Sequence, residues 1–317
     1  MLTDGLVDAG HDVTLFATGD SETKAKLEFE FEVAPGSKFI NSVWHDTLHT
    51  LRAYRDPSRF DLYHVHSPWS ALATGAHSGR PIVHTLHWSF TPEMRRLYGA
   101  VEDRAWVVAI SEAQRRHMEE LNYAGVVYNG IDLDRYPLNE DKEDFVLFLG
   151  RSAPEKGALR AVLAAREAGV PLVIALKAAY PEEIEHWERN VQPQLAPDTV
   201  VYKEISHDQK ADLLGRAKAV LFPIDWEEPF GLVMTESMAC GTPVIATPRG
   251  SVPEVIVDGE TGFIVPVDDY PREAAEVLER VKEIDPRACR RRVEQKFSKE
   301  AMVAGYERAF ERVLSSA

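Results

Sequence analysis

Two glutamates separated by seven residues mark the most informative segment of the chain, which runs from Trp226 to Ile245. Glu228 lies in a loop after an apolar run, and Glu236 lies in the helix that the pattern predicts next. Gly231 permits a close backbone approach where that helix begins, so the amides near Gly231 and Leu232 can bind an anion. Carboxylates beside an anion suit hydroxyl donors, such as those of a sugar or a ribose. Taken alone, the pair could equally be a first-turn charge and a solvated helix residue.

A second loop, Gly150–Gly157, carries two cations between a predicted strand at 145–149 and a predicted helix at 158–168. In a doubly wound domain such a turn presents backbone amides to phosphates. Arg151 adds a planar fork and Lys156 a point charge, which together suit two linked phosphates. The loop lacks the glycine patterns typical of dinucleotide and triphosphate sites. The alternative is an ordinary turn with solvated side chains. If the cations serve a ligand alone, replacing them should leave the melting temperature of the ligand-free protein unchanged.

Histidines and tryptophans gather where two predicted strands of the first half end. The four histidines are His64, His66, His84 and His87. His66 and His87 end their strands and are expected at the mouth of a cleft, whereas the other two are expected in the core. The neighbouring Trp69 and Trp88 could stack on an acceptor sugar or pack in the core. A zinc site built from the four histidines is disfavoured, because no carboxylate or cysteine ligand lies near them.

The elements that must position these residues alternate between short apolar runs and helical patterns, which predicts parallel βαβ units. A polar, proline-containing run at 137–144 separates two such series. We therefore expect an α/β protein of two doubly wound domains with the ligand between them, at the carboxyl ends of strands. The domains are expected at 1–138 and 139–297, with a helix at 298–317 that packs back toward the first domain. The expected strands are 12–17, 28–33, 61–66, 81–85, 105–110, 125–128, 145–149, 171–176, 199–203, 219–223, 243–246 and 262–265.

The beginning of the chain departs from this plan, because the helical pattern Met1–Ala9 precedes the first strand. A doubly wound domain starts with a strand and a glycine-rich turn before that helix. The first strand and its loop are therefore expected to be missing from the first domain. Either the strands pair differently there, or the chain is a truncated form of a longer protein; we favour truncation.

Composition limits the classes of function further. The chain has 317 residues, of which 44% are hydrophobic, and a formal net charge of −15. This acidity argues against nucleic acid as a partner. The two cysteines, Cys240 and Cys289, provide no disulfide framework and fit a reducing compartment. No apolar run is long enough for a transmembrane segment, and the N-terminus does not have the pattern of a signal peptide. We expect a soluble, cytoplasmic protein.

The motifs together resemble those of the family 4 retaining glycosyltransferases, which have the GT-B fold of two facing Rossmann-like domains. The Glu228-x7-Glu236 segment is similar to the signature of that family. The loop Gly150–Gly157 resembles its diphosphate-binding Gly-Arg-x4-Lys-Gly pattern. Two further matches, Asn129–Asp132 and Gly259–Pro266, resemble its Asn-Gly-Val/Ile-Asp motif and its closing turn and strand. The resemblance covers nearly the whole chain.

The resemblance implies transfer of a hexose-type sugar from a nucleotide-diphosphate sugar to an unidentified hydroxyl acceptor. It implies no cofactor, and because no aspartate pair or Asp-x-Asp run stands out as a metal motif, we expect no obligatory metal. The diphosphate would bind Arg151, Lys156 and the amides of Gly231 and Leu232, and Glu236 would bind the ribose. The implied catalytic residues are Glu228, at the donor sugar, and His87, which orients the sugar and phosphate. On the acceptor side the candidates are His66, Trp69 and Trp88.

Three other functions stay open at this point. A catalytically inactive or truncated nucleotide-sugar-binding protein would bind the donor without turnover. A sugar-nucleotide epimerase with the GT-B fold would convert the donor without an acceptor. A glycoside hydrolase also needs paired carboxylates, but it does not need a phosphate loop. The sequence does not identify the base, the sugar, the acceptor, the oligomeric state or the route of retention.

Overall fold

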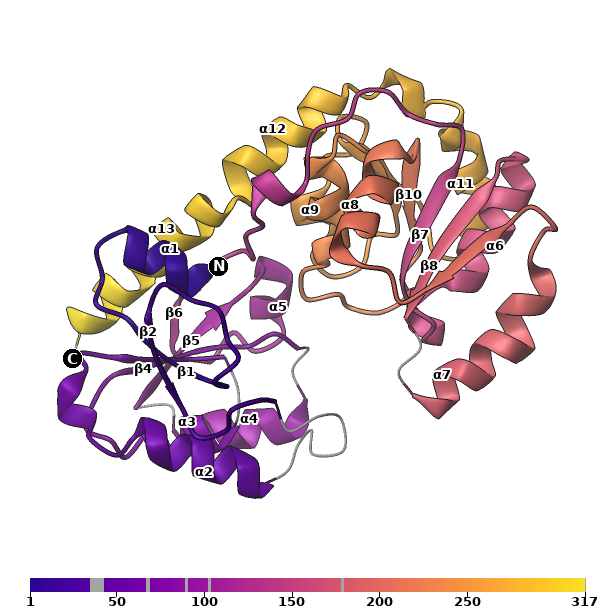
Figure 1. The fold of residues 1–317 in the computed structure, drawn as a ribbon. Coiled ribbons are helices and arrows are strands. Elements are labelled where there is room, and N and C mark those ends of the chain that lie inside the picture. The colour runs from indigo at the N-terminus through magenta and orange to yellow at the C-terminus, as the bar shows by residue number, and fades with distance from the viewer. Residues whose placement is uncertain (35–42, 67–68, 89–90, 102–103, 178–179, 317) are drawn as a thin grey trace. The chain divides into compact units, whose positions relative to one another are not determined.

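The chain forms two compact units in the computed structural model, which describes residues 1–34, 43–66, 69–88, 91–101, 104–177 and 180–316 (Figure 1). Unit 1 comprises Met1–Tyr128 and Lys299–Ala317, and unit 2 comprises Asn129–Ser298. The first division therefore falls at 128/129, whereas the sequence pattern had suggested 138. The reason is that the intervening segment packs within unit 2, where the Tyr136 backbone and side chain are both hydrogen-bonded.

Unit 2 contains one parallel sheet with the order β12-β11-β10-β7-β8-β9. This is the order of a doubly wound nucleotide-binding domain, and it reverses between β7 and β10. Loops that follow these two strands lie beside the point at which such sheets bind ligands. The strands are β7 (Val146–Arg151), β8 (Leu172–Lys177), β9 (Val200–Lys203), β10 (Ala219–Phe222), β11 (Val244–Ala246) and β12 (Gly262–Ile264).

Glycines allow the loops of unit 2 to approach one another closely. A Cβ on Gly157, whose φ is +78°, would lie 2.1 Å from the backbone oxygen of Pro223, so no other residue fits there without displacement. The helix that follows Gly157 is therefore held against the end of β10. The helices of the unit are α6 (Ala158–Ala168), α7 (Pro181–His186), α8 (His207–Arg216), α9 (Leu232–Ala239), α10 (Val252–Val255), α11 (Tyr270–Leu278) and α12 (Pro286–Lys296).

Unit 1 has its strands in two parallel sheets. The larger contains β3 (Tyr63–Val65), β4 (Ile82–Thr85), β5 (Ala105–Ala109) and β6 (Tyr123–Val126), in that order. The smaller contains β1 (Thr14–Ala17) and β2 (Lys26–Phe29). In the doubly wound order, an additional first strand would separate β1 from β3. The sheet of unit 1 is thus divided at the place where the sequence pattern lacks a strand.

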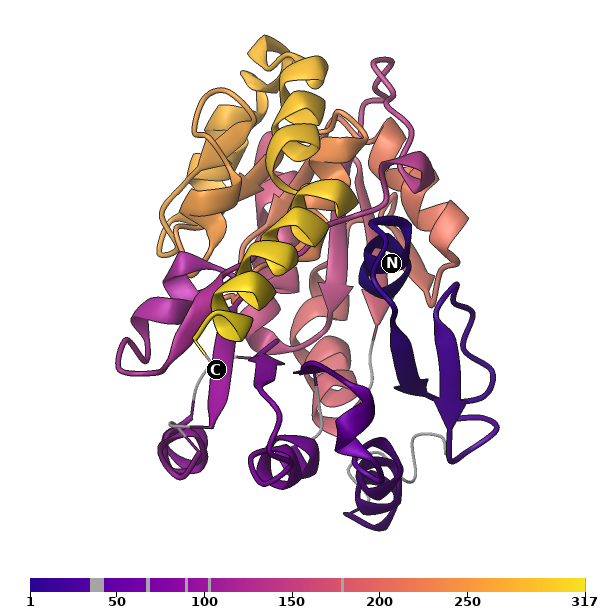
Figure 2. The same ribbon diagram turned by 90° about the vertical axis from the view of Figure 1, so that its left-hand side faces the viewer.

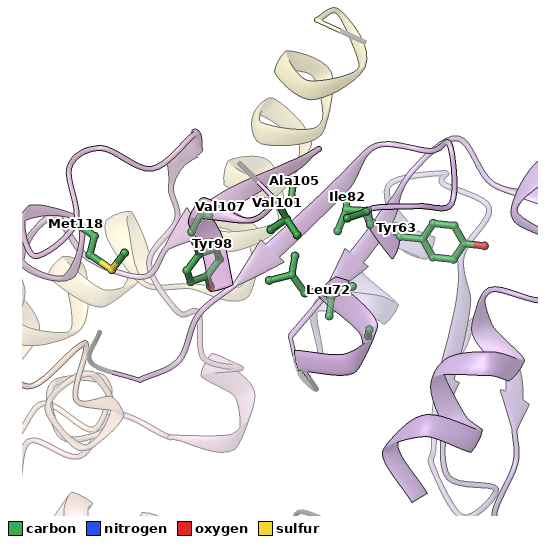
Figure 3. Packing of buried hydrophobic residues seen from close by; sticks show 11 residues of the cluster. Tyr63, Leu72, Ile82, Tyr98, Val101, Ala105, Val107 and Met118 are labelled. Atoms are coloured by element: carbon green, nitrogen blue, oxygen red, sulfur yellow. The ribbon is translucent and has the colours of Figure 1, made fainter. Parts of the chain in front are cut away.

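Helices cover both faces of the larger sheet of unit 1 (Figure 2). On one face, Leu72 and Tyr98 pack against strand residues such as Ile82 (Figure 3). On the other face, Tyr306 packs against Val83, the next residue of the same strand. The helices are α1 (Leu2–Asp8), α2 (Val43–Ala53), α3 (Trp69–Gly75), α4 (Pro92–Gly99), α5 (Glu112–Arg116) and α13 (Lys299–Leu314). Helix α13 thus belongs to unit 1.

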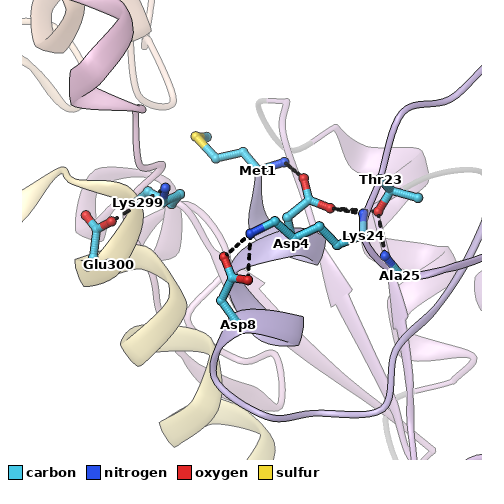
Figure 4. A network of polar contacts seen from close by, with 8 residues as sticks. All are labelled: Met1, Asp4, Asp8, Thr23, Lys24, Ala25, Lys299 and Glu300. Atoms are coloured by element: carbon cyan, nitrogen blue, oxygen red, sulfur yellow. Dashed lines mark hydrogen bonds and ion pairs between the residues drawn. The ribbon is translucent and has the colours of Figure 1, made fainter.

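Helix α1 is attached on two sides. Asp4 Oδ1 accepts hydrogen bonds from Thr23 Oγ1 at 2.7 Å and from the Lys24 amide at 2.8 Å (Figure 4). These bonds connect α1 to the segment that leads into β2. On its other side, a Cβ on Gly5 would lie 2.5 Å from Val303 Cγ2, so α1 and α13 are in close contact. The helix predicted at the beginning of the chain therefore forms and packs within unit 1.

Candidate active site

The loop after β7 and the loop after β10 meet through Lys156 and Glu228. Lys156 Nζ donates to Glu228 Oε2 at 2.7 Å, and Trp226 Nε1 donates to the same oxygen at 3.1 Å. The ammonium also lies 4.1 Å from the centroid of the Trp226 ring, within the range of a cation–π interaction. Only 20% of the lysine side chain and 12% of the glutamate side chain are exposed. The two residues predicted for phosphate and sugar are therefore neighbours.

Backbone contacts fix the loop that carries Glu228. The Asp225 amide donates to the Glu155 carbonyl at 2.8 Å, which joins this loop to the one that carries Lys156. The Ser251 amide donates to the Glu228 carbonyl at 2.9 Å. A Cβ on Gly250 would lie 2.2 Å from that same carbonyl oxygen, so this close approach requires glycine. The position of Glu228 is thus determined by the backbone of three separate loops.

Glu236 is held in a similar way on helix α9. Its Oε1 accepts hydrogen bonds from Tyr136 Oη and from Lys210 Nζ, each at 2.6 Å. The glutamate is 7% exposed and the tyrosine 5%, so the carboxylate depends on these donors for compensation. Burial raises the pKa of Tyr136, and the charge of Glu236 raises it further, so the hydroxyl keeps its proton. Glu236 is a buried carboxylate whose charge is balanced by Lys210, and not a solvated helix residue.

The two glutamates share one pattern of contacts. In each, a lysine and an aromatic side chain donate to a single carboxylate oxygen. Within the described parts of the chain, Glu228 Oε1 and Glu236 Oε2 have no hydrogen-bond partner. A carboxylate oxygen accepts readily from hydroxyl groups. The lysines cancel the charge that would otherwise repel a nearby anion, so two glutamates are compatible with a phosphate site.

Arg151, at the end of β7, pairs with Glu183 of helix α7. Its guanidinium also lies 5.2 Å from the centroid of the Tyr180 ring. Glu183 is 2% exposed, and its carbonyl accepts a hydrogen bond from Ser152 Oγ at 3.1 Å. The arginine side chain is itself 43% exposed. The Arg151 side chain is thus held by Glu183 at the end of β7 and is still partly exposed to solvent.

Helix α9 begins at the expected glycine. Gly231 has φ +77°, and a Cβ there would lie 2.7 Å from Met234 Cε and 3.3 Å from Glu228 Cγ. The next residue, Leu232, is 44% exposed. Helix α9 is therefore exposed at Leu232, beside Glu228, and the first amides of a helix lack carbonyl partners within it. The Met234 amide already donates to the Gly231 carbonyl at 3.0 Å.

His66 and His87, each predicted at the end of a strand, lie beside each other in unit 1, just beyond the carboxyl ends of the adjacent strands β3 and β4. His66 Nδ1 and His87 Nε2 lie 2.8 Å apart, and their ring planes are inclined by only 15°. One nitrogen must donate and the other accept, so at least one imidazole is neutral. Burial, followed by the nearness of His87, lowers the pKa of His66 to about 4. Burial also lowers the pKa of His87. The pair is uncharged at neutral pH.

The two tryptophans and the other two histidines differ in how far they are exposed to solvent. Trp88 is 53% exposed, whereas Trp69 packs against the core, with its ring centroid 5.4 Å from that of His84. His84 is buried, as expected, and its Nδ1 lies 2.6 Å from Tyr98 Oη. His64 Nε2 lies 2.8 Å from Thr85 Oγ1. The described residues contain no group of three or more side chains arranged to hold a metal ion.

Four contributors to the site were missed by the sequence analysis, namely Tyr136, Glu183, Lys210 and Trp226. Trp226 is the first residue of the segment Trp226–Ile245 and lies two residues before Glu228, so its position in the sequence could have indicated a role. The other three lie far from their partners along the chain; Tyr136, for example, is 100 residues before Glu236. Without an observed fold, nothing in their local pattern distinguishes them from other polar residues of the chain.

Comparison with known proteins decides the family. The family described as Glycosyl transferases group 1 matches residues 131–299, and Glycosyltransferase Family 4 matches residues 1–135. The chain belongs to the family 4 glycosyltransferases. This glycosyltransferase is 31% identical over 314 residues to the phosphatidyl-myo-inositol mannosyltransferase of Mycolicibacterium smegmatis. That similarity covers 87% of this chain and 78% of the relative.

Solved structures agree with the assignment of this glycosyltransferase to the GT-B fold. AviGT4, a glycosyltransferase involved in Avilamycin A biosynthesis, superposes with a TM-score of 0.73 at 25% identity, over 100% of this chain and 88% of that one. The Anabaena protein Alr3699/HepE in complex with UDP and glucose has a TM-score of 0.73 at 20% identity, over 98% of this chain and 95% of that one. The predicted fold class and family are thus confirmed. In the described part of the glycosyltransferase, no helix is long and apolar enough to cross a membrane.

Proposed function

We propose that this glycosyltransferase moves a hexose-type sugar from a nucleotide-diphosphate sugar to a hydroxyl acceptor, with retention of the anomeric configuration. The observation that carries the proposal is the contact of Lys156 with Glu228 beside the reversal in strand order of unit 2. A cation and a carboxylate with a free oxygen suit a phosphate linked to a sugar. The name of the mannosyltransferase relative and the UDP and glucose of the Anabaena complex support a nucleotide-sugar donor.

In this proposal the donor diphosphate binds Lys156, Arg151 and the first amides of helix α9, at Gly231 and Leu232. Negative charge develops on the diphosphate as the glycosidic bond breaks. Cations and amides that contact it therefore stabilise the transition state more than the bound substrate. Because Lys156 already pairs with Glu228, a phosphate oxygen competes with that carboxylate for the ammonium. Donor binding is thus an exchange of counter-ions.

The glutamates receive the hydroxyl groups of the donor. Glu228 Oε1 accepts from the transferred sugar, and Glu236 Oε2 accepts from the ribose. In unit 1, the uncharged His87 orients the sugar and phosphate. His66, Trp69 and Trp88 are assigned to the acceptor side, where the exposed ring of Trp88 supplies a surface for stacking. No metal is required for the charge stabilisation, since cations and amides supply it.

A transfer assay tests this function. UDP-glucose, GDP-mannose and ADP-glucose are each incubated with the chain and with phosphatidyl-myo-inositol or simple sugars as acceptors, with and without EDTA. Nuclear magnetic resonance of the product reads the anomeric configuration. We expect transfer from one donor, an unchanged anomeric configuration and no effect of EDTA. Hydrolysis or epimerisation without transfer would contradict the assigned reaction, an inverted product would contradict retention, and loss of activity in EDTA would contradict metal independence.

A further inference from the structure

Tyr136 and Lys210 converge on one atom of Glu236. They come from different parts of unit 2, the segment before β7 and helix α8, and both donate to Oε1 at 2.6 Å. The ammonium also lies 5.5 Å from the centroid of the tyrosine ring, so the two donors contact each other. We call these two residues the Glu236 clamp. With both donors on Oε1, the carboxylate is restricted in rotation and its Oε2 has a defined direction.

The backbone of Tyr136 is anchored as well. Arg290 Nη1 of helix α12 donates to the Tyr136 carbonyl at 2.6 Å and to the Ala239 carbonyl at 3.0 Å. Ala239 is the last residue of α9, the helix that carries Glu236. The arginine thus connects the tyrosine to the helix of its partner, so that the clamp and the glutamate are held in one assembly. Such support favours a fixed carboxylate geometry.

We propose that Tyr136 and Lys210 are positioning residues that direct Glu236 Oε2 toward the ribose hydroxyls of the donor nucleotide. The inference rests on the proposed ribose contact of Glu236 and adds the residues that make this contact selective. Lys210 has a second effect, since its charge offsets that of Glu236 beside a site that must accept a diphosphate. The pattern also explains why a glutamate that is 7% exposed remains available to a ligand, because only one of its oxygens is occupied.

The two roles of the clamp, support of the fold and selectivity for ribose, predict different binding data. A residue that merely supports the fold affects ribonucleotides and deoxyribonucleotides alike. A positioning residue changes the difference between the two affinities, whether or not both affinities also fall. The experiment therefore measures the affinities of UDP, GDP and ADP and of their 2′,3′-dideoxy counterparts by calorimetry. The base that binds the parent most tightly is then used throughout, and its ribose preference is the ratio of the two affinities.

We expect the parent to prefer the ribonucleotide by at least tenfold and Glu236→Gln to lose most of this preference. Tyr136→Phe and Lys210→Met should each reduce the preference by about threefold to tenfold, while Lys210→Arg should retain more of it than Lys210→Met. Two matched controls should leave it unchanged. Lys218→Met removes an equally shielded lysine from its pair with Asp144, and Tyr270→Phe removes a buried hydroxyl that donates to the Ile245 carbonyl.

The outcomes separate the inference from the function on which it rests. A preference that is lost in Glu236→Gln but intact in Tyr136→Phe and Lys210→Met would overturn the clamp and leave the ribose contact standing. An equal fall in affinity for both nucleotides would also overturn it, because the clamp would then be structural only. A parent that binds both nucleotides equally would overturn the ribose contact and the clamp together. If Lys210→Met does not fold, Tyr136→Phe decides alone.

Discussion

Lys156 and Glu228 are 72 residues apart in the chain, yet the lysine Nζ lies 2.7 Å from the glutamate Oε2. Each is the counter-ion of the other in the ligand-free protein. Under the proposed function, a diphosphate bound to Lys156 would replace this existing partner and free Glu228 from its lysine. The proposal therefore predicts that binding of a phosphate at Lys156 changes the charge around Glu228, the residue assigned to the donor sugar.

Replacement of Trp226 tests how Glu228 is held. The indole N–H donates to Glu228 Oε2, while its ring face lies against Lys156. Trp226→Phe removes the N–H but keeps an aromatic face, so we expect turnover to fall by about tenfold, the equivalent of one hydrogen bond to a charged group, with nucleotide affinity nearly unchanged. Trp226→Leu should weaken nucleotide binding as well, because it also removes the cation–π contact.

Steady-state kinetics and calorimetry with the preferred donor distinguish these effects. The control is Trp44→Phe, since this tryptophan is 80% exposed in unit 1 and should tolerate the change. Unchanged turnover in Trp226→Phe would show that its hydrogen bond does not position Glu228.

Arg151→Ala should lower stability even without ligand. The sequence alone suggested that Arg151 and Lys156 are dispensable for the melting temperature, but both are ion-paired with shielded carboxylates. Removing the guanidinium withdraws a counter-ion from Glu183, which is 2% exposed. Since the arginine is partly exposed, we expect a loss of about 1–3 kcal/mol in the free energy of unfolding. The double variant Arg151→Ala, Glu183→Gln should recover part of it.

Denaturant unfolding of the ligand-free chain measures these differences. Arg189→Ala is the control, because its pair with Glu185 joins side chains that are 75% and 56% exposed and should contribute less than about 1 kcal/mol. If Arg151→Ala is as stable as the parent, the earlier expectation that this cation serves the ligand alone is the correct one.

The sequence predicts those parts of the fold that depend on neighbouring residues, and it fails where distant contacts decide the structure. The twelve strands formed where expected because runs such as Val146–Leu149 are continuously apolar, as buried parallel strands require. The largest error at a strand end is at β2, which ends at Phe29 and not at Val33, since the residues beyond are half-exposed or exposed. The sequence pattern at 111–121 also predicts a helix, but the helix observed there, α5, ends at Arg116. Its apolar Met118 is buried outside the helix, so burial did not imply helix there.

The site was predictable only in part, for the same reason. Local motifs identify Arg151, Lys156, Glu228 and Glu236 as site candidates. The positions of His66 and His87 at predicted strand ends identify these two histidines. The clamp could not be found, because Tyr136 and Lys210 reach Glu236 from separate segments and neither belongs to a local pattern. Pairing of cations with internal carboxylates is likewise a tertiary property.

Acid should destabilise the protein between pH 6.5 and 4.5 through its buried histidines. Burial lowers the pKa of His84 from 6.5 to about 3, and that of His66 falls to about 4. The unfolded chain therefore binds more protons than the folded chain in this window. Stability is complete above about pH 6.5 and falls with decreasing pH, by up to about 1.4 kcal/mol per pH unit for each such histidine. Carboxylates such as Glu28, with a pKa lowered from 4.5 to about 2, act mainly below it.

Denaturant unfolding at several pH values, with His84→Asn beside the parent, measures this dependence. Asparagine can accept from Tyr98, the partner of His84 Nδ1, but does not titrate. We expect a smaller slope for the variant from pH 6.5 down to about 3, the pKa of His84 in the folded chain, and equal slopes only below that pH. Parallel curves throughout would exclude His84 as a source of the acid sensitivity.

Hydrogen exchange should show that β1 and β2 are the least protected strands of the fold. Among the residues that the structure describes, they pair only with each other, and all four residues of β1 are half-buried. Strand β7, by contrast, begins with three buried residues and has partners on both sides. Two-stranded sheets are marginal by themselves, so this pair depends on its attachments. These attachments include Phe16, whose ring centroid lies 5.9 Å from that of Phe60, and the hydrogen bonds of Asp4. Arg59 Nη2 also donates to Glu28 Oε1 of β2 at 2.6 Å.

We therefore expect the amide of Lys26, which donates to the Val13 carbonyl at 3.0 Å, to exchange at least about a hundredfold faster than those of Leu147 and Val173, through local opening that leaves unit 2 folded. Asp4→Ala should accelerate exchange in β1 and β2 further, because it releases α1 from the segment before β2, and should leave β7 unchanged. Mass spectrometry of the exchanging chain resolves these strands. Equal protection of β1 and β7 would contradict this prediction. It would mean that the sheet of β1 and β2 opens only when the whole protein unfolds.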